Sequence, residues 1–132
     1  MFDISKYFTR GLRNTILAKP GLNFSYKGPW TQIFKGEAID RWFVGDFLSA
    51  EYTITIELDS SNREIIKCLV TAGPNTASIN AYGRSTVGDP IVNIAATVNG
   101  SYVELVLTPK DESKKGAKAA FHATYYEAHD PI

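Results

Sequence analysis

Three observations predict an all-β protein: a single antiparallel β-sandwich, jelly-roll-like, that follows an N-terminal arm containing a short helix. First, apolar and polar residues alternate repeatedly between Ala50 and Tyr126, and a period of two is typical of half-buried strands. Second, turn-forming residues divide these runs at intervals of about eight to twelve residues, a spacing typical of sandwiches. Third, Asn99-Gly100 lies between two alternating runs and is the strongest hairpin signal in the chain.

The first nineteen residues predict a short amphipathic helix. Phe2, Phe8 and Leu12 recur at roughly helical spacing, and basic residues occupy the other face. Gly11 interrupts this pattern, and Pro20 ends it because proline cannot continue a helix. We expect Phe2, Phe8 and Leu12 to contact a neighbouring subunit, since an exposed apolar face marks an interaction site. Removal of residues 1–21 is then expected to leave a folded sandwich that no longer assembles.

Residues 22–49 are rich in aromatic side chains but are interrupted by Gly28-Pro29 and Gly36. Two interpretations fit this composition. Either the segment supplies edge strands and closes one end of the core, or Trp30 and Trp42 anchor the chain to a partner subunit, since aromatic residues dominate the desolvated centres of interfaces. We divide the chain into an N-terminal arm, residues 1–42, and a sandwich body, residues 43–132.

The body contains six expected strands. In the first, Tyr52, Ile54 and Ile56 fall on one face, and threonine and glutamate residues fall on the other. A polar connection over residues 59–63 joins this strand to the second as a hairpin. The expected strands cover residues 50–58, 64–71, 77–83, 91–98, 101–109 and 117–128.

The Asn99-Gly100 pair predicts the geometry of one hairpin. A type I′ turn requires positive φ at both central residues, so it would join Val98 tightly to Ser101. The charged loop over residues 110–116 lies before the last strand and is expected to be a solvated tip.

Length and composition indicate one domain. The chain has 132 residues, of which 44% are apolar and 21% charged, so a core can form without disulfides. Its single cysteine, Cys68, shares a face with Ile66 and Val70 and is expected to be a small buried hydrophobe. The sequence shows no apolar segment of a secretory signal or a transmembrane helix. We expect a protein that is made in the cytoplasm and binds no membrane.

The net charge is zero but is unevenly distributed. Residues 1–45 carry seven basic and three acidic side chains, a net charge of +4, and the remainder carries −4. A net charge of +4 is too small for a nucleic-acid-binding surface, which needs clustered basic residues. The uneven distribution suits self-association, in which the N-terminal segment of one subunit lies on the body of another.

The sequence predicts no catalytic, cofactor or metal site. His122 lies opposite Phe121 in the last strand and His129 lies near the C-terminus, and neither has ligands at metal-binding spacing. No nucleophile elbow or phosphate-binding loop is present. Most of the carboxylates are expected at outward strand positions or in turns, where they are solvated: Asp46, Glu51, Glu57, Asp59, Glu64, Asp89 and Glu104.

A carbohydrate-binding module is the alternative from another functional class. Small β-sandwiches can present aromatic rings for stacking on sugars, although the same rings more often close a core or an interface. The candidate aromatic residues are Trp30, Trp42, Tyr82, Tyr102 and Tyr126.

The order of pieces between Phe43 and Tyr126 resembles a known protein class. A strand with the sequence AEYTI leads through a charged hairpin to EIIKCLV, then to a YGR turn, an alternating strand with an Asn-Gly turn, and a final strand beginning GAK and ending in TYY. This order is similar to that of small virion structural proteins of tailed bacteriophages, particularly contractile-tailed phages of marine bacteria. The resemblance implies a β-sandwich that assembles in many copies and transfers no catalytic residue.

The resulting functional expectation is a non-enzymatic structural subunit of the virion, in the tail or baseplate apparatus. Its partners would be other virion proteins and copies of itself, without direct nucleic-acid contact. Capsid decoration on the head lattice is the near alternative.

Overall fold

A computed structural model describes residues 24–127. The expected N-terminal helix, Phe2, Phe8, Leu12 and His129 lie outside the described residues. The described part forms nine strands and one short 3-10 helix: β1 (Phe24–Lys27), β2 (Thr31–Ile33), β3 (Glu37–Phe43), β4 (Phe47–Asp59), β5 (Asn62–Ala72), β6 (Ala77–Val87), β7 (Val92–Asn99), β8 (Tyr102–Pro109), η1 (Glu112–Lys114) and β9 (Ala117–Glu127).

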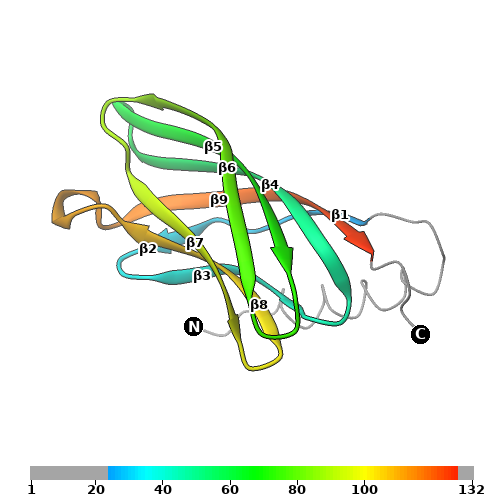
Figure 1. The fold of residues 1–132 in the computed structure, drawn as a ribbon. Helices are drawn as coiled ribbons and strands as arrows, with labels where there is room; N and C mark the ends of the chain where they lie inside the picture. Colours follow the sequence, from blue (N-terminus) through cyan, green and yellow to red (C-terminus); the bar gives the residue numbers. More distant parts are fainter. Residues whose placement is uncertain (1–23, 128–132) are drawn as a thin grey trace.

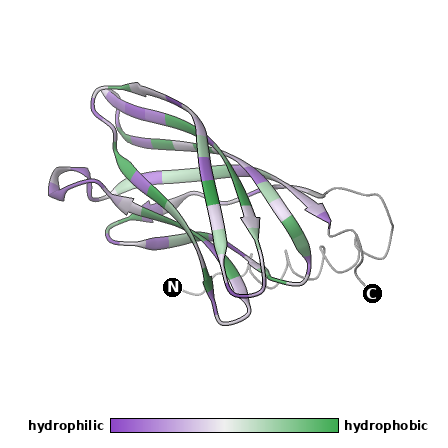
Figure 2. Ribbon diagram, viewed as in Figure 1, coloured by the Kyte–Doolittle hydropathy of each residue, from purple (hydrophilic) through white to green (hydrophobic). Residues whose placement is uncertain are grey.

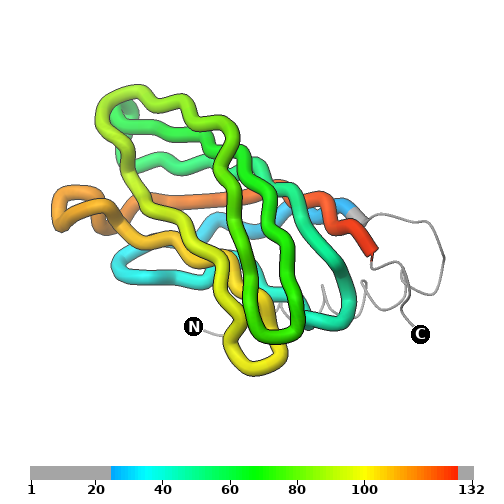
Figure 3. The backbone as a smooth tube through the Cα atoms, in the orientation of Figure 1, coloured from blue at the N-terminus to red at the C-terminus, as the bar shows by residue number. Residues whose placement is uncertain are grey.

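These strands form two antiparallel sheets. The large sheet has the order β1-β9-β4-β5-β6, and β2 also pairs with β9. The small sheet has the order β3-β8-β7, and Figure 1 shows it alongside the large one. The tube in Figure 3 follows β4, β5 and β6 as a continuous meander, and this order of consecutive neighbours differs from the two Greek keys of a jelly roll.

The inward faces of both sheets share one hydrophobic core. Along β4, β5 and β9, buried residues alternate with exposed or partly exposed ones, as the alternating colours in Figure 2 illustrate. Ile54, Ile66 and Phe121 from the large sheet belong to the same buried cluster as Trp42 and Leu105 from the small sheet. Burial of this apolar surface, at about 25 cal/mol per Å², holds the two sheets together.

All six expected strands are present, several of them longer than expected. The aromatic segment also forms strands, which differs from an arm that ends at residue 42. β1 pairs with residues 122–125 of β9, β2 pairs with residues 117–119, and β3 pairs with β8. Gly28 and Pro29 separate β1 from β2 instead of keeping the segment out of the sheets, so the segment closes one side of the core.

The β7–β8 hairpin turns one residue later than expected. Asn99 pairs with Tyr102 and Val98 with Val103, so Gly100 and Ser101 form the turn. Gly100 has a φ of 64°, and no non-glycine residue among those described has a positive φ. Glycine as the first central residue is the pattern of a type II′ turn, which needs positive φ at that position alone. The predicted type I′ turn is therefore wrong.

Candidate interaction surface

The outward side chains of β9, β4, β5 and β6 form one continuous surface, which we call the outer face. Strand register defines its rows. Thr53 on β4 pairs with His122 on β9 and with Lys67 on β5. In a neighbouring row, Glu51 pairs with Leu69. Polar and apolar side chains alternate along the β5 part of this surface, whereas the β4 part is polar, and the small sheet covers only the opposite, inward side.

Several large apolar side chains are exposed on this outer face. Ile65 and Leu69 lie two rows apart on β5, since Lys67 lies between them. Single exposed apolar residues are ordinary, but a group of neighbours marks an interaction surface. The group and its exposed fractions are Ile65 40%, Leu69 42%, Tyr82 49%, Trp30 58% and Val87 60%.

Trp30 stands between two open hollows at one end of the outer face. The first, about 470 Å³, is lined by Trp30 together with Ile65, Val87 and Glu57. The second, about 530 Å³, is lined by Trp30, Glu57 and Lys118, among others. Glu57 and Trp30 therefore belong to both hollows, and we call this region the Trp30 end.

Tyr82 lies away from Trp30, at mid-length of the edge strand β6. It lies where the pairing of β5 with β6 shifts register, between the partners of Lys67 and Cys68. Its hydroxyl donates a hydrogen bond of 2.6 Å to Glu51 Oε2, and this bond raises the pKa of Tyr82 to about 12. This hydrogen bond directs the Tyr82 side chain toward the row in which Glu51 pairs with Leu69. We call this region the Tyr82 end.

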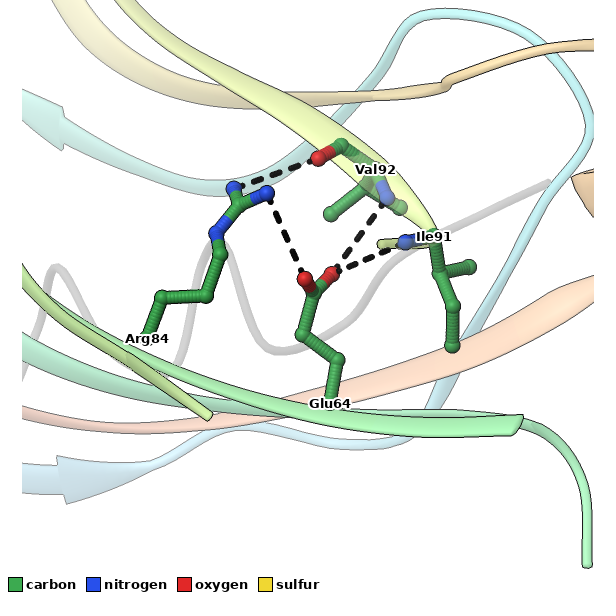
Figure 4. A network of polar contacts seen from close by, with 4 residues as sticks. All are labelled: Glu64, Arg84, Ile91 and Val92. Atoms are coloured by element: carbon green, nitrogen blue, oxygen red, sulfur yellow. Dashed lines mark hydrogen bonds and ion pairs between the residues drawn. The ribbon is translucent and has the colours of Figure 1, made fainter. Parts of the chain in front are cut away.

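A buried carboxylate connects the large sheet to the start of β7. Glu64 Oε1 accepts hydrogen bonds from the backbone N–H groups of Ile91 and Val92, at 3.2 and 3.4 Å. Arg84 lies 3.3 Å from Glu64 Oε2 and donates to the Val92 carbonyl oxygen (Figure 4). Glu64 and Ile66 are two positions apart on β5, so both side chains point to the same, inward face. The expectation of an outward Glu64 is therefore wrong.

A second buried polar cluster connects β3 to the large sheet. Asp40 Oδ2 accepts hydrogen bonds from the hydroxyls of Tyr52 and Tyr125, at 2.7 and 2.6 Å. Trp42 Nε1 donates to the Tyr52 hydroxyl at 3.0 Å. Trp42 thus fills the core of the subunit itself, and its buried side chain is not available on the folded surface as a partner anchor or a sugar platform.

The remaining aromatic candidates are dispersed. Tyr102 lies on the small sheet, where the guanidinium of Arg41 is 4.3 Å from its ring centre. Tyr126 is partly buried near the end of β9. Of the aromatic residues proposed for sugar binding, Trp30, Tyr82 and Tyr126 lie on the outer face, with Tyr126 paired with Ser49 on β4. Sequence pattern placed Trp30 in the aromatic segment and Tyr82 and Tyr126 in strands but gave no signal that they share one surface.

Within residues 24–127, no group of three or more His, Cys, Asp or Glu side chains is arranged to hold a metal ion. His122 is exposed on β9, as expected from its position opposite Phe121. None of the helices in the described part is long and apolar enough to cross a membrane.

Cys68 is buried in the core, as predicted, and burial raises the pKa of its thiol from 9.0 to about 12. Burial beside Asp40 also raises the pKa of Tyr52 well above 10.0. At a pH between a group's pKa in the unfolded chain and its pKa in the folded chain, the group is deprotonated in the unfolded chain but still protonated in the folded one. We expect the free energy of unfolding to fall as pH rises above 9, by at most about 4 kcal/mol from Cys68 alone.

Urea denaturation from pH 8 to 11 measures this dependence. The Cys68→Ala variant removes the group that titrates first, so its stability should decline later and less steeply, beginning above pH 10 with Tyr52 and Tyr82, whose pKa values are also raised in the folded chain. Identical pH profiles for the two proteins would contradict the role of the thiol.

Comparison with known proteins yields two solved structures that are similar to part of this fold. The tailspike protein of Acinetobacter phage vB_ApiP_P1 is 13% identical, with a TM-score of 0.42, over 77% of this chain and 21% of that chain. A tailspike protein from Acinetobacter baumannii bacteriophage Fri1, a capsular polysaccharide depolymerase, is 12% identical, with a TM-score of 0.40, over 81% of this chain and 17% of that chain. The chain thus spans about a fifth of the length of these tailspikes. No protein-family model matches the sequence, and no curated protein matches it.

Proposed function

We propose that this chain is a non-enzymatic structural subunit of a bacteriophage virion, present in multiple copies in the tail or baseplate apparatus. The observation that carries the proposal is the exposed apolar group on the outer face, and above all its Tyr82 end. Leu69 and Tyr82 lie there on β5 and on the edge strand β6, where a second protein surface can cover them.

The sequence resemblance of residues 43–126 to virion structural proteins supports the particle as the place of assembly. The fold supports the same role, because two sheets around one core give a rigid body whose outer face is free for contacts. Capsid decoration uses the same kind of contact on the head lattice, so the location in the particle separates the two roles.

The subunit contact is tested by Leu69→Lys. The full chain should self-associate, and a charge at this exposed position should raise its dissociation constant at least tenfold, because a lysine ammonium is costly to desolvate at the centre of an interface. Folding should be retained, since the side chain is already partly in water. Analytical ultracentrifugation measures association, and thermal unfolding verifies the fold.

Phe34→Lys is the matched control, because Phe34 is similarly exposed but lies after β2, outside the outer face. It should leave association unchanged. A chain that stays monomeric at hundreds of micromolar, and that is missing from a reconstruction of the phage particle, would exclude the structural role. Density for this fold on the head lattice would move the assignment to capsid decoration.

A further inference from the structure

We propose that the Trp30 end of the outer face binds a saccharide, with the Trp30 indole as the stacking platform. This site is separate from the subunit contact at the Tyr82 end. Along β5, Ile65 of the Trp30 end and Leu69 of the Tyr82 end are four residues apart, about 13 Å.

The backbone on both sides of Trp30 is anchored, so the exposed ring has a defined position. Gly28 N–H donates to the Phe121 carbonyl oxygen at 2.8 Å, and Thr31 pairs with Ala119. Only Pro29, whose ring fixes φ, lies between the first anchor and the tryptophan. A large ring that is 58% exposed on such a rigid support is presented to solvent instead of closing the core.

Polar groups that suit sugar hydroxyls surround this ring. Arg63 and Glu57 form an ion pair of 2.9 Å in which both side chains remain about half exposed, so their outer hydrogen-bonding positions are free for a ligand. The Gln32 amide is oriented by its bond of 3.2 Å to the Gly116 carbonyl oxygen. Lys118 lines the same hollow. A carboxylate, a guanidinium and an amide around one aromatic ring combine apolar contact with oriented polar groups, as small-molecule sites require.

The chemistry of the two ends favours a saccharide over a second subunit at this position. The centre of a protein interface is depleted in glutamate and lysine, whereas Glu57 and Lys118 both line the Trp30 hollows. Thr55 and Ser85 add hydroxyls to the first hollow. Its volume of about 470 Å³ also falls in the range of small-ligand sites, about 300–1,000 Å³.

The test is binding of the full chain to an array of defined oligosaccharides built from hexoses, hexosamines and uronic acids, followed by titration of the strongest binder. Trp30→Ala should weaken binding at least tenfold, and Arg63→Ala should weaken it severalfold. Leu48→Ala, which removes a similarly exposed apolar side chain at the opposite end of β4 from Glu57, should bind as the unchanged protein does. Ligand should alter tryptophan fluorescence in the unchanged protein but not in Trp30→Ala, whose remaining tryptophan is the buried Trp42.

Two binding results would overturn the saccharide site. One is the failure of every oligosaccharide on the array to bind. The other is binding that survives Trp30→Ala. If Trp30→Ala instead weakens self-association, the Trp30 end belongs to the subunit contact and the saccharide proposal is dropped, while the structural role stands.

Discussion

Replacing Glu64 with alanine is expected to lower the free energy of unfolding by about 3–5 kcal/mol, the range found when one partner of a buried charge pair is removed. The side chain of Glu64 is fully buried, and its carboxylate serves both the Arg84 guanidinium and two backbone N–H groups of β7. Without it, the two backbone N–H groups stay desolvated and unpaired, and Arg84 keeps only its bond to the Val92 carbonyl oxygen. The loss should be greatest where β5 and β6 meet β7.

Glu57→Ala is the matched control for Glu64→Ala. Glu57 also pairs with an arginine, Arg63, but both side chains are about half exposed, so the pair contributes less than about 1 kcal/mol. Urea denaturation of the two variants measures the difference. Hydrogen exchange should show faster opening at the start of β7 in Glu64→Ala alone. Equal losses in the two variants would show that burial does not set the importance of Glu64.

Gly28→Ala is expected to destabilise the protein by about 3 kcal/mol, at the upper end of the usual cost of overpacking a core. A β-carbon at this position would lie 2.1 Å from the nearest atom of the Phe121 ring. That ring cannot move freely, because it also packs against Tyr26 and Tyr52 at centroid distances of 5.9 and 5.8 Å. The pairing of β1 with β9 would have to shift instead.

Gly73→Ala separates this steric effect from the general effect of removing a glycine. At Gly73 the nearest atom to an added β-carbon is 3.8 Å away, and φ is not positive. Alanine should therefore be neutral or stabilise the fold slightly, by reducing the entropy of the unfolded chain. Thermal unfolding of the two variants measures the comparison. A Gly28→Ala protein as stable as Gly73→Ala would mean that Phe121 can move aside easily.

The candidate site was only partly predictable. Glu64, Ile66 and Cys68 occupy alternate positions of β5, so their alternation alone places Glu64 on the inward face. The expectation of an outward Glu64 instead follows the general rule that carboxylates prefer water. That rule fails here because Arg84 and the start of β7 supply the compensating partners. The sequence makes Trp30 a candidate, yet its neighbours Ile65 and Val87 come from strands much later in the chain.

The sequence by itself determined the six strands between residues 47 and 127 and, for most of them, which face is buried. Alternation is a local property, because each side chain points opposite to its neighbours whatever the strand later pairs with. Tertiary structure alone decided that residues 24–43 join both sheets. It also decided that Trp42 hydrogen-bonds the Tyr52 hydroxyl in the core and that Trp30 and Tyr82 share the outer face. These outcomes depend on which distant segments pair. The Asp40–Tyr125 hydrogen bond, for example, joins residues 85 positions apart, and pairing at such separations is set by the burial of the whole core against the entropy of closing the intervening loops.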